Sequence, residues 1–572
     1  MRNINNLLLV SIFTLFFLVT AQSQNNVYPY DIQKKIICEN GAVVSGHVLA
    51  SKVGVDMLKK GGNAVDAAIA TQLALAVVHP SAGNLGGGGF LVARLQNGTT
   101  TTIDYREIAP GKAHRDMYLD EKGEAKFELS QNGHLSSGIP GTVAGLFESM
   151  KYAKLPFVVL IQPAIDLAKN GFVISDREAR SLNALKNEFL KYNTVVPALV
   201  KAESENSEWK GGDTLFQKDL AATLLRIQKN GASGFYEGET AQLIVEEMKR
   251  GNGIISLEDL KNYKAIVRAP HIFDYKGYSI VGMPMPSSGG LLLHQMMKMI
   301  ENKLKVTDGF LSPNAVQLMV EAERRAFADR AEFMGDADFY KVPVAALTDK
   351  KYLNNRMSDF VVGKAGSSEM IKLGSVPITE SEETTHLSVI DKEGNAVAVT
   401  TTLNNSYGSR TVVGGAGFLM NDEMDDFSIK PGSPNMYGAL GGEANAIMPG
   451  KRMLSSMTPT IVLKNNKPFL IIGTPGGTTI PTSVFQTIVN VIDFNMSTED
   501  AVWQPKFHHQ WMPDRVDLEK GFPLATRKAL EAMGYKIIDR GSIGRTEVIK
   551  VLANGKFEAV ADNRGEDAAV GW

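Results

Sequence analysis

The sequence predicts an α+β fold in which stacked, mainly antiparallel sheets are covered by helices. Segments with helical periodicity fill the first part and the middle of the chain. Two pairs of short strand-like runs, each pair joined by a turn, follow within residues 386–403 and 458–473. A hairpin that buries one face needs a covering layer, and the neighbouring helices can supply it. We therefore expect sheets on the inside and helices on the outside.

The N-terminus has the pattern of a secretory signal peptide. Residues 1–6 hold one positive charge and no acid, residues 7–19 are apolar apart from Ser11 and Thr14, and residues 20–24 are small and polar. The apolar run is short for a membrane span, although an uncleaved N-terminal anchor is the alternative. We expect removal of residues 1–23 and a periplasmic or secreted protein. No other run is long and apolar enough to cross a membrane, so the mature protein should have no span.

Composition excludes several classes of partner and cofactor. The 572 residues carry a formal net charge of −2, which gives no electrostatic case for binding nucleic acid or an anionic membrane. The single cysteine, Cys38, cannot form an internal disulfide. The nine histidines are scattered, and the adjacent pair His508-His509 would point to opposite faces of a strand. We expect no metal and no cofactor.

The first elements have clear boundaries. Residues 50–60 have helical periodicity and stop at Gly61-Gly62, a helix C-terminal signal. Asn63 can cap a second helix over residues 64–78, which is apolar on all sides and should be buried. The glycine-rich segment 83–89 then leads into a strand over residues 91–95. A phosphate loop needs strand, glycines and helix in that order, so these glycines indicate close packing near a site instead.

The middle of the chain, about residues 144–364, is predicted to be mostly helical. The helices expected there cover residues 158–170, 219–228, 240–250 and 315–333. Residues 363–383 differ, because they are rich in Gly, Ser, Thr, Pro and acid and lack apolar periodicity. We expect an exposed, flexible segment that leads directly into Thr384.

The hairpin after Thr384 places a second hydroxyl beside this residue. Strands are expected over residues 386–390 and 396–403, with a turn at 391–395. If Ile390 pairs with Asn395 or Ala396, the same register places Thr384 opposite Thr401 or Thr402. A second hairpin over residues 458–463 and 468–473 completes the strand pattern.

Thr384 becomes a catalyst if the chain is cut just before it. It would then own a hydroxyl and a free α-amine, and the amine can act as the base for the hydroxyl. A free α-amine has a pKa of about 7.7–8.0, which suits a base near neutral pH. This interpretation predicts a self-cleaving precursor, two subunits and a covalent acyl-enzyme.

Ordered motifs over nearly the whole chain give a resemblance to one family. They are Gly86–Phe90, Asp104–Glu107, Thr384–His386, Asp391–Thr400, Met424–Ser428, Leu454–Pro459 and Pro475–Gly477. Together they resemble the γ-glutamyltranspeptidases, or glutathione hydrolases. The resemblance implies an N-terminal-nucleophile hydrolase fold, an αββα sandwich. It also implies autocleavage between Glu383 and Thr384, giving a large subunit, residues 24–383, and a small catalytic subunit, residues 384–572.

The resemblance also implies roles for individual residues. Thr384 would be the nucleophile, Thr402 its hydrogen-bonding neighbour, and the Gly476 and Gly477 N–H groups the oxyanion hole. The donor is zwitterionic, so its pocket needs both signs of charge. Arg106 with Ser455 and Ser456 would bind the α-carboxylate, and Asn404, Glu423 and Asp426 the α-ammonium. The loop at residues 430–438 would be a lid, with Tyr437 as its gating aromatic residue.

The implied function is γ-glutamyl hydrolysis and transfer. Glutathione or another γ-glutamyl amide would form an ester with Thr384, and water, an amino acid or a dipeptide would then accept the γ-glutamyl group. The mature protein would be a heterodimer of its own two subunits. An acylase or poly-γ-glutamate-processing enzyme of the same fold is one alternative, and a noncatalytic periplasmic binding protein for a glutamyl ligand is another. A nucleophile-elbow serine hydrolase is disfavoured, because G-x-S-x-G does not occur.

Overall fold

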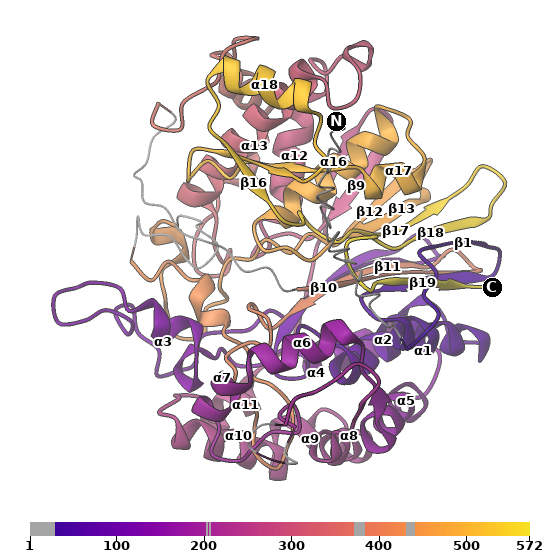
Figure 1. Ribbon diagram of the computed structural model, residues 1–572, viewed down its shortest axis with the longest axis vertical. Coiled ribbons are helices and arrows are strands. Elements are labelled where there is room, and N and C mark those ends of the chain that lie inside the picture. Colours follow the sequence, from indigo (N-terminus) through magenta and orange to yellow (C-terminus); the bar gives the residue numbers. More distant parts are fainter. Residues whose placement is uncertain (1–28, 202–203, 205–206, 371–383, 431–440) are drawn as a thin grey trace, which may run out of the picture.

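The chain folds into four layers, in the order helices, sheet, sheet, helices (Figure 1). The computed structural model describes residues 29–201, 204, 207–370, 384–430 and 441–572. The predicted signal peptide, Glu383 and Tyr437 lie outside the described residues. The predicted α+β class, with two stacked antiparallel sheets covered by helices, is confirmed.

The first sheet contains the hairpin that follows Thr384. Its seven strands are all antiparallel to their neighbours. In spatial order they are β19 (Ala568–Gly571), β2 (Gly41–Ser45), β10 (Thr385–Asp391), β11 (Ala396–Thr402), β3 (Gly88–Arg94), β4 (Thr100–Asp104) and β7 (Ile266–Arg268). Strand β10 is thus central, and it pairs with β2 from the N-terminal part of the chain on one side.

The second sheet also has seven antiparallel strands. Their order is β1 (Lys35–Cys38), β18 (Phe557–Val560), β17 (Glu547–Val551), β13 (Lys467–Gly473), β12 (Thr460–Lys464), β9 (Tyr278–Gly282) and β8 (His271–Tyr275). Two smaller groups complete the strands: β14 (Phe507–His508), β15 (Val516–Glu519) and β16 (Ile537–Arg540), and the pair β5 (Phe172–Val173) and β6 (Thr214–Leu215).

A dry core joins the two sheets. Val44 and Phe90 of the first sheet pack in one buried cluster with Val281, Ile461 and Ile471 of the second. Side chains alternate between the faces of each strand, so the intervening residues of the first sheet face a helix layer instead. Both faces of each large sheet are therefore covered, and the central strands of the first sheet are fully buried.

Helices cover the outer face of each sheet. Those that cover the first sheet or extend that layer lie at the bottom of Figure 1. They are α1 (Val48–Lys59), α2 (Ala64–Val78), α4 (Thr142–Ser149), α5 (Phe157–Asn170), α6 (Asp176–Ala184), α7 (Lys186–Tyr192), α8 (Lys218–Asn230), α9 (Ser233–Tyr236), α10 (Gly238–Arg250) and α11 (Leu257–Asn262). The short α3 (Phe127–Gln131) lies at the side.

The helices over the second sheet pack in a separate cluster with its strands. They are α12 (Gly289–Ile300), α13 (Pro313–Phe333), α14 (Val344–Leu347), α15 (Lys350–Arg356), α16 (Thr479–Ile492), α17 (Thr498–Trp503) and α18 (Leu524–Met533). In the described ranges, no helix is both long enough and apolar enough to cross a membrane.

The boundaries predicted at the start of the chain are confirmed. Asn63 caps α2 through its side-chain oxygen, which accepts from the Val65 and Asp66 N–H groups. In turn, the Asp66 carboxylate accepts from the Asn63 N–H. This is a capping box, and it satisfies donors that the first helical turn leaves unpaired. Every residue of α2 is buried, as its uniformly apolar sequence predicted.

The middle of the chain is mostly helical, as predicted, but the short strands β5 to β9 interrupt it. Of these, β7 and β8 are edges of the two large sheets. The described part of the segment predicted to be exposed, residues 363–370, is exposed at both ends. Between these ends Ser368 is fully buried, its hydroxyl donates to the Trp511 carbonyl, and its N–H donates to Asp514. The prediction of exposure therefore fails at this residue, because its polar groups bond to partners within the protein.

A buried carboxylate connects α10 to the segment after β11. Glu247 is 2% exposed, lies 2.9 Å from His134 Nε2 through Oε1, and accepts from the Gly414 N–H at 2.9 Å. It also pairs with Arg250. Burial alone would raise the pKa of Glu247, but these hydrogen bonds lower it to about 2. The carboxylate is therefore a charged link between parts of the chain on opposite sides of Thr384.

Candidate active site

The register of the β10–β11 hairpin places two threonine hydroxyls together. Thr385 pairs with Thr401 and Ile390 with Ala396, as the turn at 391–395 predicted. The preceding residue, Thr384, then faces Thr402, and their Oγ1 atoms are 3.4 Å apart. Thr384 is 4% exposed. The predicted second hydroxyl beside Thr384 is therefore present.

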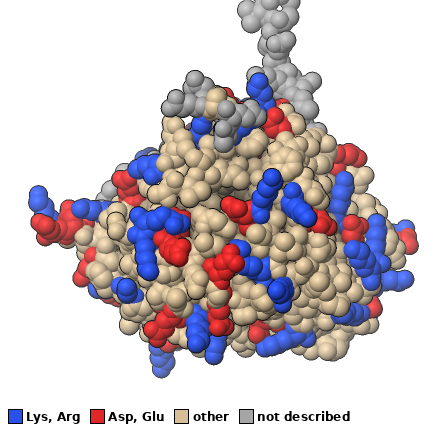
Figure 2. All heavy atoms as spheres, turned by 90° about the horizontal axis from the view of Figure 1, so that it is seen from below, with Lys and Arg blue, Asp and Glu red and all other residues tan. Residues whose placement is uncertain are grey.

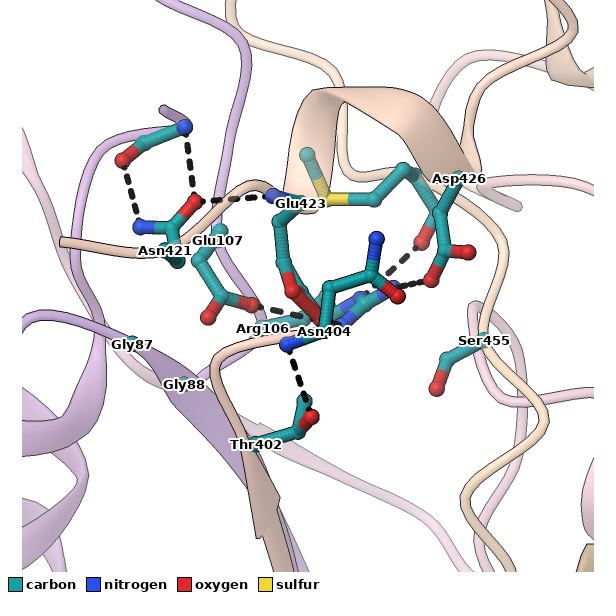
Figure 3. Close-up of polar contacts among 12 residues, drawn as sticks. Gly87, Gly88, Arg106, Glu107, Thr402, Asn404, Asn421, Glu423, Asp426 and Ser455 are labelled. Carbon is teal, nitrogen blue, oxygen red and sulfur yellow. Dashed lines mark hydrogen bonds and ion pairs between the residues drawn. The ribbon is translucent and has the colours of Figure 1, made fainter. Parts of the chain in front are cut away.

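Backbone contacts fix the position of Thr402. The Asn404 N–H donates to Thr402 Oγ1 at 2.8 Å (Figure 3). Asn404 has a φ of 76°, the left-handed conformation that Asn tolerates better than most residues. This turn bends the chain directly after β11 and brings the Asn404 amide over the hydroxyl.

The glycines before β3 allow the strand to lie against this turn. A Cβ on Gly87 would lie 2.1 Å from the Thr402 carbonyl oxygen, and a Cβ on Gly89 would lie 2.5 Å from the Thr400 carbonyl oxygen. Neither backbone oxygen can move without displacing β11. The predicted role of these glycines, close packing near a site, is confirmed.

Arg106 lies behind the threonine pair and is surrounded by acceptors. Its terminal nitrogens pair with Glu423 and Asp426, as Figure 3 shows. It also donates to Glu107 at 3.4 Å and to the Met453 and Leu454 carbonyl oxygens at 3.3 and 3.5 Å. A guanidinium has five N–H groups, so these five contacts engage the whole fork.

Glu423 and Asp426 come from one short 3₁₀ helix, Glu423–Asp426. Asn421 holds its start, because its side-chain oxygen accepts from the Gly138 N–H at 2.8 Å and the Glu423 N–H at 3.1 Å. Its amide donates to the Gly86 and Gly138 carbonyl oxygens. Sequence reasoning missed Asn421, although it stands only two residues before Glu423.

Burial sets the electrostatics of this cluster. Burial raises the pKa of Glu107 well above its usual range, and Glu423 adds to that effect. Burial also raises the pKa of Glu423, against the attraction of Arg106. Burial opposes the charge of Arg106, but Glu423, Asp426 and Glu107 together raise its pKa. The cluster can therefore hold both a cation and a proton in a dry environment.

The segment before α16 forms another part of the pocket wall. Gly476 and Gly477 have φ angles of 134° and 54°, which favour glycine. Gly477 and Thr478 line the same pocket as Thr384, and α16 begins at the next residue. The N-terminus of a helix favours negative charge, so this wall suits an oxyanion.

Ser455, Ser456 and Arg330 form the remaining wall. The Ser455 N–H donates to the Pro286 carbonyl, and its own carbonyl accepts from the Ser288 N–H at 2.8 Å. Arg330, from the last turn of α13, donates to Ser456 Oγ at 3.1 Å and to Ser288 Oγ at 3.2 Å. Sequence reasoning missed Arg330.

Most of the predicted site residues meet in one pocket. Its lining consists of Arg106, Arg330, Thr384, Thr402, Asn404, Glu423, Asp426, Ser455, Ser456, Met457, Gly477, Thr478 and Ile480. Gly476 stands one residue before this lining. Among the described residues no cluster of three or more His, Cys, Asp and Glu could hold a metal ion.

The chemistry of the pocket is therefore that of a hydroxyl nucleophile among fixed charges. Thr384 is the first described residue after position 370, and it immediately precedes β10. Cationic and anionic side chains line the pocket with it, as do Gly477 and Thr478. This arrangement suits acyl transfer from a zwitterionic acyl group.

Comparisons with known proteins agree with this geometry. Residues 50–572 match the family described as gamma-glutamyltranspeptidase. The chain is 47% identical over 538 residues to the glutathione hydrolase proenzyme of Escherichia coli K12, covering 94% of this chain and 92% of that protein.

Two solved structures share the fold. A cephalosporin acylase from Bacillus halodurans aligns with a TM-score of 0.83 at 25% identity, covering 96% of this chain and 98% of its own. A γ-glutamyltranspeptidase chain from Helicobacter pylori aligns with a TM-score of 0.55 at 41% identity. It covers 61% of this chain and 97% of its own length.

Proposed function

The chain belongs to the γ-glutamyltranspeptidase family, and we propose that Thr384 is its nucleophile after cleavage of the Glu383–Thr384 bond. The protein is an enzyme of glutathione hydrolysis and γ-glutamyl transfer that is made as a proenzyme. Residues 24–383 then form the large subunit and residues 384–572 the small one. The observation that carries the proposal is the position of Thr384, beside the Thr402 hydroxyl in a pocket of fixed charges.

Cleavage and catalysis use the same hydroxyl. In the precursor, Thr384 Oγ attacks the Glu383 carbonyl carbon, the peptide C–N bond breaks, and the nitrogen leaves as the α-amine of Thr384. Water then hydrolyses the resulting ester and releases the Glu383 carboxylate. This sequence needs no metal or cofactor, and it leaves the hydroxyl and its base on one residue.

The mature site acts by a two-step exchange. Thr384 Oγ attacks the γ-carbonyl carbon of the donor, and the α-amine takes the hydroxyl proton and passes it to the leaving amine. The Gly476 and Gly477 N–H groups stabilise the negative oxygen of the tetrahedral intermediate. Water, an amino acid or a dipeptide then attacks the γ-glutamyl ester, and Thr384 recovers its proton.

Recognition of the donor depends on its two α-substituents. Glu423, Asp426 and Asn404 bind the α-ammonium, and Arg106, Ser455 and Ser456 face the α-carboxylate. A noncatalytic binding protein could also use these charges, but it would have no need of a hydroxyl at the head of a strand beside a second hydroxyl.

The surroundings fit a small-molecule enzyme of the periplasm or the medium. Figure 2 shows Lys and Arg interspersed with Asp and Glu on the helical face, so this face offers no field of one sign for a polyanion. The predicted signal peptide supports export. The partners we propose are glutathione and other γ-glutamyl amides, their acceptors, and the second subunit of the same chain.

An acylase is the second candidate, because a cephalosporin acylase shares the fold over 96% of this chain. The two candidates differ in the acyl group. The acidic pair of Glu423 and Asp426 favours a donor with an α-ammonium, so a γ-glutamyl anilide should react much faster than a glutaryl anilide. An equal or faster rate with the glutaryl compound would favour the acylase.

The first test is the intact mass of the purified protein together with the N-terminal sequence of its smaller fragment. We expect two chains, the smaller beginning Thr-Thr-His-Leu-Ser, and release of aniline from a γ-glutamyl anilide. A single uncut chain with no activity would contradict the proposal.

A further inference from the structure

Arg330 is a buried cation that faces the pocket from the helix layer over the second sheet. It lies in the last turn of α13 and is 7% exposed. Its guanidinium lines the same pocket as Thr384 and Asp426. Arg330 Nη2 donates to Ser456 Oγ, which belongs to the pocket wall, and Arg330 Nε donates to Ser288 Oγ.

The partners of Arg330 differ in kind from those of Arg106. The guanidinium N–H groups of Arg106 donate to carboxylates and backbone carbonyl oxygens of the protein. Arg330 bonds to two neutral hydroxyls, and no carboxylate of the described residues comes within 4.0 Å of its nitrogens. Burial lowers the pKa of Arg330 to about 10; attraction by Asp426 opposes this shift and repulsion by Arg106 adds to it, so Arg330 keeps its charge at neutral pH.

A buried guanidinium that bonds only to neutral hydroxyls is unfavourable unless a ligand supplies a stronger acceptor. Arg330 and Arg106 repel each other, and Asp426 offsets this repulsion only in part. An anion bound beside the two guanidiniums would relieve the repulsion, and the α-carboxylate of the donor is such an anion.

We propose that Arg330, together with Ser456, binds the α-carboxylate of the γ-glutamyl donor. The inference rests on the proposed function and adds a recognition residue to it. Arg106 faces the same carboxylate, and its fork is held by Glu423 and Asp426, so Arg330 adds hydrogen bonds from a second guanidinium. The result is a clamp with one cation from α13 and one from the segment after β4.

The test compares two donors on the two-chain enzyme: γ-glutamyl anilide, and the same compound with its α-carboxylate replaced by a neutral carboxamide. For Arg330→Met we expect kcat/KM on the carboxylate donor to fall about 10- to 100-fold, mainly through KM, because a charge-assisted hydrogen bond is lost. The rate on the carboxamide donor should stay within about 2-fold. Arg330→Lys keeps the charge without the fork and should fall in between.

Arg325→Met is the matched control, since Arg325 is a buried arginine of the same helix that pairs with Glu321 and Asp359. It should leave the preference between the two donors unchanged. Equal losses on both donors in Arg330→Met, or no loss on either, would overturn the inference. If Arg330→Met does not mature, the donor preference of Arg330→Lys decides: a reduced preference supports the inference and an unchanged one overturns it. A wild-type enzyme inactive on γ-glutamyl anilide would instead refute the proposed function.

Discussion

Replacing Thr402 by valine and by serine tests whether its hydroxyl activates Thr384. Valine keeps the shape of threonine and removes the hydroxyl, while serine keeps the hydroxyl. The Asn404 N–H already donates to Thr402 Oγ1, so the hydroxyl proton can be directed at Thr384 Oγ1, 3.4 Å away. That separation exceeds the usual 2.7–2.8 Å of an O–H···O bond, so the contact is weak before the donor binds.

The expected effects can be estimated separately for rate and stability. A catalytic hydrogen bond that tightens only during the reaction should lower kcat about 10- to 100-fold when it is lost, which corresponds to about 1.4 to 2.8 kcal/mol. Thr402→Val also leaves the buried Asn404 N–H without its acceptor, at a cost of about 1–3 kcal/mol in the free energy of unfolding. Thr402→Ser should retain both contacts and stay within about 3-fold of wild-type kcat.

The assay is the rate of aniline release in a single turnover, normalised to the fraction of chains that have been cut. Normalisation separates slow chemistry from slow maturation, and thermal unfolding reports the stability term independently. Equal single-turnover rates for the valine and serine variants would refute the hydrogen-bonding role of Thr402.

Three further predictions follow from single contacts. Thr384→Ala should give one uncut chain by intact mass and no anilide hydrolysis, and a processed, active variant would remove Thr384 as nucleophile. Gly87→Ala should destabilise the protein by about 1–3 kcal/mol and lower kcat, because the new Cβ meets the Thr402 carbonyl, whereas Gly541→Ala meets open space and should be neutral in both assays. The fold lowers the pKa of Glu247, so the ionised carboxylate stabilises the folded protein by up to about 3 kcal/mol. This contribution is fully present above pH 4.5 and is lost as the pH falls toward 2. Glu247→Gln should flatten that part of the stability–pH curve, and an unchanged slope would contradict the assignment.

Local signals predicted a large share of the fold. The α2 capping box needs only Asn63 and Asp66, three residues apart, and the β10–β11 register needs only a turn of known length. Strands β7 to β9 escaped prediction because they are short and lie at or next to a sheet edge, where partly exposed residues show no clear apolar alternation. Strands β7 and β9 pair with strands far away in sequence, and the local composition cannot predict that pairing.

The site residues also fall into those that the sequence could predict and those that it could not. Residues that stand in ordered motifs, such as Thr384 and Asp426, could be named from the chain. Arg330 could not, because it lies in a helix that contains other arginines and acids, and its sequence neighbours do not say which side chain faces the pocket. Asn421 acts through backbone groups of segments almost three hundred residues away, so only the folded chain reveals its role.

The sheet topology explains how the proposed cut can leave the structure intact. Thr384 immediately precedes β10, so breaking the bond before it removes no hydrogen bond of the ladder. The first sheet contains strands from both sides of the cut, with β10 and β11 lying between β2 and β3, and the second sheet is likewise shared. The pocket is shared as well, since Arg106 and Arg330 precede the cut and the threonines follow it. Cleavage therefore adds a free amine to a site whose charges come from both subunits, and separating the subunits would break two sheets.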